Sequence, residues 1–364
     1  MAGARPASAP PKVSVVMPVH DRERYLGAAI ESVLGQSFPD FELVIVDDGS
    51  RDRSASVARS YRDARIRLVS HARNRGVAAT RNTGIAGARG AYLAFLDSDD
   101  VAFPDRLARQ VAFLDRHPDH AVVGSWVDWM AEDGRPLGKV RRRPVAAADI
   151  AAQRLFRTGI QNDTGMARTA VLRRYPLDEG LPIGEDFDLW MRVAAEHKMA
   201  NLPRVLVRMR AHGARITHRY ADSVRVFRNR VVARHLEALG VAFAEEDLDR
   251  HTLLRRMAGE GFVPDRAYLD WIEGWFASLR ANNALTRAFP EPAFGHTLGA
   301  FWLKTCWYAS DGLGWRRFFA SPLAAGAARG LGKEIALHLP RSLGPAPRLP
   351  RAIAPRDGCG AATR

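Results

Sequence analysis

The sequence predicts an α/β fold in which helices flank a mainly parallel sheet, followed by a helical C-terminal region. Short runs rich in β-branched residues alternate with helical patterns over the first 125 residues, as in parallel-sheet proteins. Beyond Arg219 the apolar residues recur at helical spacing. At 364 residues the chain is long for one compact domain, so we expect a main domain with an appendage or a second domain.

Strands and helices alternate along the predicted sheet domain. We expect strands at residues 13–17, 41–46, 66–69, 91–96 and 121–124. Helical patterns lie between them, at 25–33, 50–61, 76–88 and 104–117. Ser50 is expected as the N-cap of the second helix, and Pro104 suits the first turn of the fourth. In sheets of this kind, ligands bind outside the carboxyl ends of the strands.

The remaining segments differ from the sheet domain in composition. Residues 140–154 turn basic and then alanine-rich, which predicts a linker or a surface helix. Helical patterns follow at 224–239, 247–258 and 268–280. We therefore expect a sheet domain over 13–217 and a helical region over 218–339. The lead-in at 1–12 and the Pro-, Gly- and Arg-rich tail at 340–364 are expected to be disordered.

About half of the net charge of +14 lies near the C-terminus. Between Arg316 and Arg364, nine Lys and Arg residues stand against Glu334 and Asp357. Such a tail attracts nucleic acid or anionic lipid, or is simply solvated in an arginine-rich protein. Two cysteines exclude a disulfide framework, and no run of eighteen apolar residues predicts a membrane span. We expect a cytoplasmic protein, with peripheral contact at the inner membrane face through the C-terminal region as an option.

Acidic residues follow three of the predicted strands, at the expected binding edge of the sheet. Asp21 follows the first strand, Asp47 and Asp48 the second, and Asp97-Ser98-Asp99-Asp100 the fourth. The glycine-rich phosphate loop of a dinucleotide site is missing after the first strand, and no HExxH or GxSxG motif occurs. Carboxylate chemistry is therefore predicted at this edge.

Asp97 and Asp99 are separated by one residue, so in an extended backbone both side chains could face one side and share a cation. Hard ions such as Mg²⁺ and Mn²⁺ bind through one or two carboxylates together with substrate phosphates. Such an ion and its diphosphate would neutralise the repulsion between the aspartates. The alternative is that the aspartates cap the turn and helix that follow.

Four motifs in this order resemble the family 2 glycosyltransferases of GT-A fold: VSVVMPVHDRERYL, ELVIVDDGSRDRS, NRGVAATRNTGIAGARGAYLAFLDSDD and GEDFDLWMR. The resemblance covers roughly residues 13–217. His20-Asp21 stands where Tyr-Asn is usual in the family, and Arg75 lies between Asn74 and Gly76 of the third motif. We therefore expect a GT-A-type sheet domain.

The resemblance implies a donor site at the first two strand ends. Pro18, Val19 and Asp21 would hold the donor nucleotide together with the pair Asp47 and Asp48. One aspartate of the pair would accept the N3–H of uracil or thymine. Which of the two does so stays open, and a tight turn with a helix cap is the alternative role.

The resemblance also implies a phosphate and metal site. Arg81 would pair with phosphate, unless it is a surface arginine. Asp97 and Asp99 match the DxD motif, in which the second aspartate ligates the metal and the first contacts the metal or the ribose. Asp100 is expected to anchor the loop. His212, in an R-x-H-x-x-x-I-T pattern, would complete the metal shell or reach the diphosphate, or be structural.

The GEDFDLW motif supplies the expected base. Leu189, Trp190 and Val193 form an apolar helical stripe, which places Glu185 and Asp186 at the helix start, where negative charge is favoured. In the resembling enzymes the aspartate of this pair deprotonates the acceptor hydroxyl. Asp186 is therefore the expected catalytic base, and Glu185 is expected beside it as a second catalytic residue. The alternative is that both acids only cap the helix. Trp190 is expected in the core.

The predicted reaction is inverting transfer of a sugar from a nucleotide-diphosphate donor, a UDP- or dTDP-sugar, to a hydroxyl of a glycan or lipid-linked acceptor. Mg²⁺ or Mn²⁺ is the expected cofactor, and cell-surface polysaccharide synthesis the expected setting. One alternative is a nucleotidyltransferase that makes nucleotide sugars, which should carry a Gly-rich loop where this chain has MPVHDRERYL. The other is a non-catalytic sugar- or nucleic-acid-binding protein. The intact DSD and GED motifs argue against it, so nucleic acid is not an expected partner.

Overall fold

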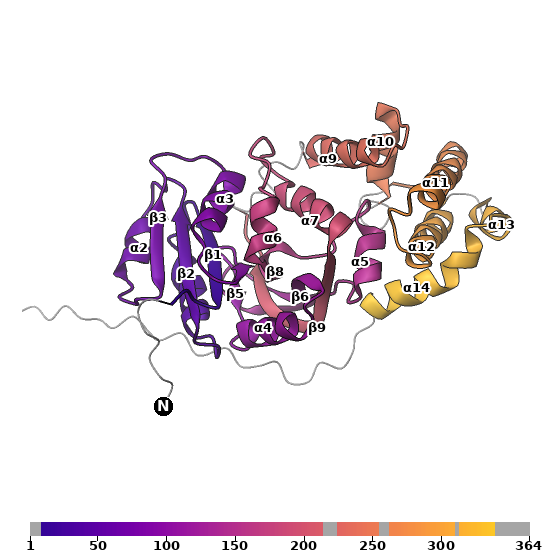
Figure 1. Ribbon diagram of the computed structural model, residues 1–364. Helices are drawn as coiled ribbons and strands as arrows, with labels where there is room; N and C mark the ends of the chain where they lie inside the picture. The colour runs from indigo at the N-terminus through magenta and orange to yellow at the C-terminus, as the bar shows by residue number, and fades with distance from the viewer. Residues whose placement is uncertain (1–8, 214–223, 255–261, 310–312, 339–364) are drawn as a thin grey trace, which may run out of the picture.

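The computed structural model describes residues 9–213, 224–254, 262–309 and 313–338. One nine-stranded sheet runs through the N-terminal part, and helices α9 to α14 lie at the other end of the molecule (Figure 1). The strand order is β3-β2-β1-β4-β8-β6-β9-β5, with β7 paired to β6. Across the described residues, no helix is both long enough and apolar enough to cross a membrane.

Four parallel strands form the half of the sheet that the sequence predicts. They are β1 (Val13–Val19), β2 (Phe41–Asp47), β3 (Ile66–Ser70) and β4 (Tyr92–Phe95). β1 lies between β2 and β4, with Val19 opposite Asp47 and Val16 opposite Phe95. The chain therefore leaves these three strands at one edge of the sheet, and the acidic residues that follow them gather there.

Helices cover both faces of these strands. They are α1 (Leu26–Leu34), α2 (Ser54–Ser60), α3 (Val77–Gly87) and α4 (Arg106–Arg116). The first two strands are buried along their whole length, because α1, α2 and α4 share a core on one face and α3 packs on the other. The expectation of Ser50 as an N-cap is wrong, since α2 begins only at Ser54. The Ser50 hydroxyl instead accepts the backbone N–H of Asp21, which ties together the loops after β1 and β2.

The second half of the sheet is mixed. β6 (His120–Met130) runs parallel to β9 (Lys198–Arg210), and the short β8 (Met166–Arg168) runs antiparallel to β4 and β6. β7 (Pro136–Arg141) folds back on β6, and β5 (Val101–Ala102) pairs with β9. The predicted strand 121–124 is therefore only part of β6. A 3₁₀ turn (Asn162–Thr164), α6 (Thr169–Arg174) and α7 (Glu185–Glu196) complete this half.

Residues 140–154 form a connection and a helix with one exposed and one buried side, so the expectation of a linker or a surface helix holds in part. They finish β7 and then form α5 (Ala147–Gln153), whose Ile150 and Ala152 are buried. α5 packs against β9 and against a C-terminal helix, α12 (Ala293–Tyr308). The buried side of α5 therefore packs between these two elements, while Ala148 on its other side is exposed.

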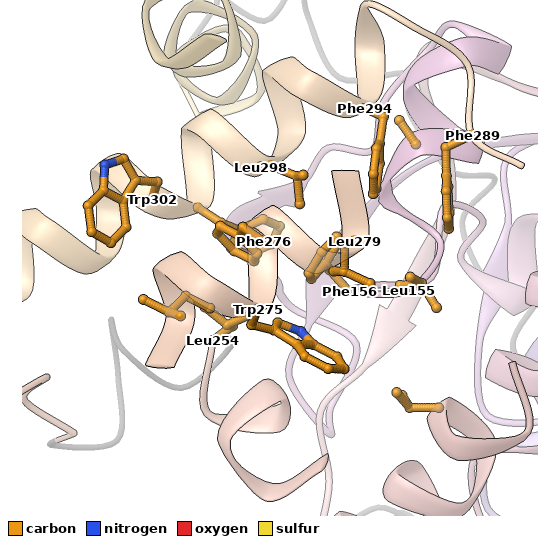
Figure 2. Close-up of a cluster of buried hydrophobic side chains, with 14 of the residues drawn as sticks. Leu155, Phe156, Leu254, Trp275, Phe276, Leu279, Phe289, Phe294, Leu298 and Trp302 are labelled. Carbon is orange, nitrogen blue, oxygen red and sulfur yellow. The ribbon is translucent and has the colours of Figure 1, made fainter. Parts of the chain in front are cut away.

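The helical C-terminal region is confirmed. It contains α9 (Val224–Ala238), α10 (Glu245–Leu253), α11 (Arg266–Thr286), α12 (Ala293–Tyr308), α13 (Leu313–Ala320) and α14 (Ala324–His338). Its core includes Phe276, Phe294 and Trp302 (Figure 2). The same apolar cluster contains Phe156, just after α5, and Phe187 of α7. One core therefore joins the helical region to the sheet domain.

Three parts of the predicted domain division lie outside the described residues. They are the boundary between 217 and 218, most of the lead-in segment 1–12, and the tail segment 340–364.

Candidate active site

The DSDD segment forms a turn after β4. The strand ends at Phe95, and the backbone N–H of Asp100 donates to the carbonyl oxygen of Asp97 at 3.2 Å. The expectation that Asp97 and Asp99 share one side of an extended backbone is therefore wrong. The turn brings the two carboxylates to different partners.

Cations of the chain itself compensate these carboxylates. Asp97 accepts a hydrogen bond from Nη2 of Arg81 at 2.8 Å, and Nε of Arg22 lies 3.3 Å from Oδ2 of Asp99. Nε2 of His212 lies 2.9 Å from the same oxygen of Asp99. Arg81 and Arg22 therefore neutralise part of the negative charge of Asp97 and Asp99. The sequence predicts that a divalent ion and its diphosphate neutralise all of it.

Asp100 holds the turn from within the protein. Its side chain is buried, and Oδ1 accepts the backbone N–H of Arg210 at 2.8 Å. Burial, and then the nearby Asp163 and Asp99, raise the pKa of Asp100 well above its usual value. Its expected role as the anchor of the loop is confirmed.

Arg81 joins the aspartate turn to helix α7. Its Nη2 binds Asp97, and its Nη1 donates to Oε1 of Glu185 at 2.5 Å. Burial works against the charged guanidinium, but Asp97 and Glu185 outweigh this effect and raise the pKa of Arg81 above its ordinary value. The alternative of a surface arginine is wrong, because Arg81 is only 4% exposed.

The first turn of α7 holds three acidic residues with different partners. Glu185 is buried against Arg81; burial raises the pKa of Glu185 to about 7, Arg81 opposes the rise and Asp186 adds to it. Asp188 is also buried and accepts from Nε of Arg192 at 2.8 Å. Asp186 is half-buried and accepts the backbone N–H of the next residue. Among the described residues, Asp186 is the acid of this turn that forms no ion pair.

Trp190, one turn further along α7, is 1% exposed and packs edge-to-face against Phe95, with ring centroids 6.2 Å apart. Its expected place in the core is confirmed.

The donor side of the edge is built by the ends of β1 and β2. Pro18 and Val19 end β1, and the carbonyl oxygen of Val19 accepts the N–H of Asp48 at 2.8 Å. The buried Asp48 carboxylate accepts the backbone N–H groups of Arg75 and Gly76, both at 2.9 Å. Asp48 therefore fixes the loop before α3 in place beside the strand ends.

Asp21 ties the loop after β1 to the loop after β2. Its Oδ1 accepts the N–H groups of Arg51 at 2.8 Å and of Asp52 at 3.4 Å. The asparagine that is usual in the resembling enzymes also has a side-chain oxygen that accepts, so this contact does not require aspartate. Asp47 has a similar local bond, in which Oδ1 accepts the N–H of Ser50 at 3.3 Å.

A cavity of about 250 Å³ adjoins the aspartate turn. Its lining includes Asp21, Arg22, Tyr25, Glu132 and His212. The Tyr25 hydroxyl donates to Glu132 at 2.8 Å, and its ring lies 4.9 Å from the imidazole of His212. Sequence reasoning missed Arg22, Tyr25 and Glu132. The one available signal was that an acid-rich edge requires nearby cations, and Arg22 follows Asp21 directly.

Metal-binding atoms converge most closely at another place. His117, Asp119 and His120 each offer one ligand atom, and these atoms lie within 4.8 Å of one another. Among the described residues, no other three His, Cys, Asp or Glu side chains bring their ligand atoms this close. Nζ of Lys198 pairs with Asp119 at 3.0 Å, just as arginines pair with Asp97 and Asp99 at the aspartate turn. The ligands predicted at the aspartate turn are less tightly gathered, and of these the structure brings Asp99 and His212 into contact.

Comparison with known proteins identifies the family. The model for glycosyl transferase family 2 matches residues 14–181. A putative glycosyltransferase of Bacillus subtilis, EpsE, is 35% identical over 211 residues, which cover 55% of this chain and 73% of the relative. The chain belongs to glycosyl transferase family 2. An uncharacterized glycosyltransferase of Haemophilus influenzae is a further relative, 27% identical over 246 residues that cover 64% of this chain and 76% of that one.

Solved structures confirm the GT-A fold of this family 2 glycosyltransferase. The structure of S. aureus TarS 1–349 in complex with UDP-GlcNAc matches with a TM-score of 0.56 at 20% identity, over 90% of each chain. The mannosyltransferase PcManGT of Pyrobaculum calidifontis, in complex with GDP-Man and Mn²⁺, matches with a TM-score of 0.50 at 19% identity, over 89% and 88% of the two chains. The family assignment sets aside the nucleotidyltransferase alternative.

Proposed function

We propose that the chain transfers a sugar, with inversion, from a nucleotide-diphosphate donor to a hydroxyl of a glycan or lipid-linked acceptor in cell-surface polysaccharide synthesis. A UDP- or dTDP-sugar is the proposed donor. The observation that carries this proposal is the pairing of buried Arg81 with Asp97 on one side and Glu185 on the other. It places the aspartate turn and the acidic start of α7 around a single guanidinium.

The donor nucleotide is assigned to the ends of β1 and β2. Pro18 and Val19 at the end of β1, with Asp21 after them, are assigned to one side of the nucleotide. Asp47 and Asp48 at the end of β2 are assigned to the other, and one of the two aspartates would accept the N3–H of the base. Support comes from the fixed loops at this edge, because a preorganised pocket loses less entropy when it binds a ligand. The TarS and PcManGT structures, which hold UDP-GlcNAc and GDP-Man, show that the fold accepts donors of this class.

The residues at the aspartate turn fit a divalent cation. The carboxylates of Asp97 and Asp99 are oxygen donors of the type that Mg²⁺ and Mn²⁺ prefer, and His212 adds a nitrogen. Nδ1 of His212 is buried without a hydrogen-bond partner in the described structure, so the ring is held by its packing and by Asp99. A bound ion would supply positive charge to the leaving diphosphate. Arg81 and Arg22 are the chain's own cations at the same place.

Asp186 is the proposed base. Glu185 and Asp188 are each committed to an arginine, whereas Asp186 is half-buried at the helix start and outside any ion pair of the described residues. Its carboxylate takes the acceptor proton as the acceptor oxygen attacks the anomeric carbon and the nucleoside diphosphate leaves on the opposite side. Glu185 and Arg81 hold the first turn of α7 in register with the donor side.

Asp186→Asn tests the assignment. The variant should bind donor as the wild type does but transfer sugar about 10²–10⁴ times more slowly, because the amide cannot accept the proton. Glu196→Gln, at the exposed far end of the same helix, is the matched control and should keep full activity.

Substrates are found by screening nucleotide sugars for Mn²⁺-dependent hydrolysis, followed by transfer to candidate acceptors. Release of nucleoside diphosphate is the expected result, and release of pyrophosphate would instead indicate nucleotidyl transfer. Equal turnover by Asp186→Asn and the wild type would refute Asp186 as the base.

A further inference from the structure

Exposed aromatic side chains gather at the end of the helical region. Trp307 and Tyr308 end α12 and are 65% and 40% exposed, and Trp315 and Phe319 of α13 are 42% and 75% exposed. The Trp307 and Trp315 rings meet edge to face with centroids 5.5 Å apart, and Trp315 stacks on Phe319 at 6.2 Å. These three rings are in contact, and Tyr308 directly follows Trp307; we call the four residues the aromatic patch. A soluble protein rarely leaves such a patch uncovered without a partner for it.

The charge beside the patch is positive. Arg316 is exposed and, among the described residues, forms no ion pair, whereas its neighbour Arg317 is paired with Asp270 and Glu273. Residues 339–364 add five arginines against Asp357.

We propose that the aromatic patch docks on an anionic lipid surface. Trp and Tyr rings are suited to the headgroup level of a bilayer, since one edge is apolar and the other forms hydrogen bonds. Arg316 and the tail arginines supply attraction to anionic headgroups. A second copy of the chain fits less well, because a two-fold contact through the patch would bring Arg316 against its own copy.

Docking through the patch brings the helical end of the molecule to the lipid. The patch lies on α12 and α13, at the end of the molecule farthest from β2 and β3 (Figure 1). The chain therefore lies on the membrane through its helical region. This proposal is independent of the proposed reaction, because lipid binding is measured without donor or acceptor.

Flotation of the full chain with vesicles tests the proposal. Vesicles of equal parts phosphatidylcholine and phosphatidylglycerol should carry the protein upward, and vesicles of phosphatidylcholine alone should carry much less. Added salt should weaken the binding, because attraction to the headgroups is screened.

The triple change Trp307→Ser, Trp315→Ser and Phe319→Ser should lower the affinity for the mixed vesicles by roughly 100-fold or more. Leu285→Ser is the matched control, since Leu285 of α11 is 87% exposed and outside the patch, and it should bind as the wild type does. Arg316→Glu should reduce binding to the mixed vesicles and leave the weak binding to phosphatidylcholine unchanged.

Two results would overturn the proposal. One is unchanged vesicle binding by the triple variant, whose folding is checked by its circular dichroism. The other is a wild-type chain that does not float and that sediments as a dimer, with the triple variant a monomer; the patch would then bind a second copy.

Discussion

Replacing Arg81 with methionine tests whether one buried guanidinium holds the two halves of the candidate site together. Methionine keeps much of the length and packing of the arginine stem but removes the charge. It leaves Asp97 and Glu185 without their shared cation. The Asp97 side chain is one-third exposed and can be hydrated again, whereas the Glu185 side chain is 7% exposed and cannot.

The cost of this change depends on pH. Removing one partner of a buried ion pair costs about 3–5 kcal/mol, because the remaining charge stays buried. Glu185 can avoid part of that cost by taking up a proton. Its pKa is about 7 with Arg81 present and rises further when the opposing guanidinium is removed. The folded state then binds this proton more tightly than the unfolded state, so stability is lost as pH rises through the folded pKa.

The stability lost in Arg81→Met is the difference between the free energies of unfolding of the wild type and the variant, each measured in urea. At about pH 6 Glu185 is protonated in both proteins, and the Arg81→Met loss should be small. Above about pH 7 the loss should grow by up to roughly 1.4 kcal/mol per pH unit, towards about 3–5 kcal/mol. Adding Glu185→Gln to the variant should remove this growth. Arg75→Met is the matched control, because Arg75 and Glu179 pair at 3.4 Å with both side chains about half exposed, and it should cost under about 1 kcal/mol.

A loss from Arg81→Met that equals the loss from Arg75→Met at about pH 9 would refute the reasoning. A loss that is the same at every pH would refute the part assigned to Glu185.

Three further predictions follow from single contacts. Between about pH 4.5 and pH 7 the free energy of unfolding of the wild type should fall by about 3 kcal/mol, because the folded state holds the Glu185 proton that the unfolded state has released. Glu185→Gln should remove this fall, and urea unfolding across that pH window measures it. Asp99→Ala should weaken Mn²⁺-dependent donor binding by at least about tenfold, and calorimetry with and without Mn²⁺ distinguishes this from general loss of affinity. Gly84→Ala should destabilise the fold by about 1–3 kcal/mol, because the new Cβ would lie 2.3 Å from Cγ1 of Val16. Gly274→Ala, at an open position of a helix, should stabilise the fold slightly, and thermal unfolding compares the two variants.

The parallel half of the fold could be predicted because its signals are local. Each of the first four strands is a short apolar run, and a run such as 41–46 can be read without knowing its neighbours. The gathering of acidic residues followed from one rule about parallel strands. The start of α7 could likewise be placed from its own apolar stripe.

The contacts that define the site could not be predicted, because they join distant parts of the chain. Arg81 and Glu185 are 104 positions apart, and His212 and Asp99 are 113 apart. Nothing in the sequence near Arg22 shows that its guanidinium faces Asp99. The same holds for the buried side of α5, because Ile150 and Ala152 belong to a helix that packs against elements far away in the sequence.

The core shared by α5, α7 and the C-terminal helices limits how this enzyme can be recombined with its relatives. Grafting only the helical region from another family member would place foreign side chains against Phe156 and Phe187. Phe187 directly follows the proposed base, Asp186, so a mismatch would shift the first turn of α7 and slow the reaction without altering any residue that meets substrate. A working chimera must therefore carry matched residues from α5 and α7 together with the donated helices.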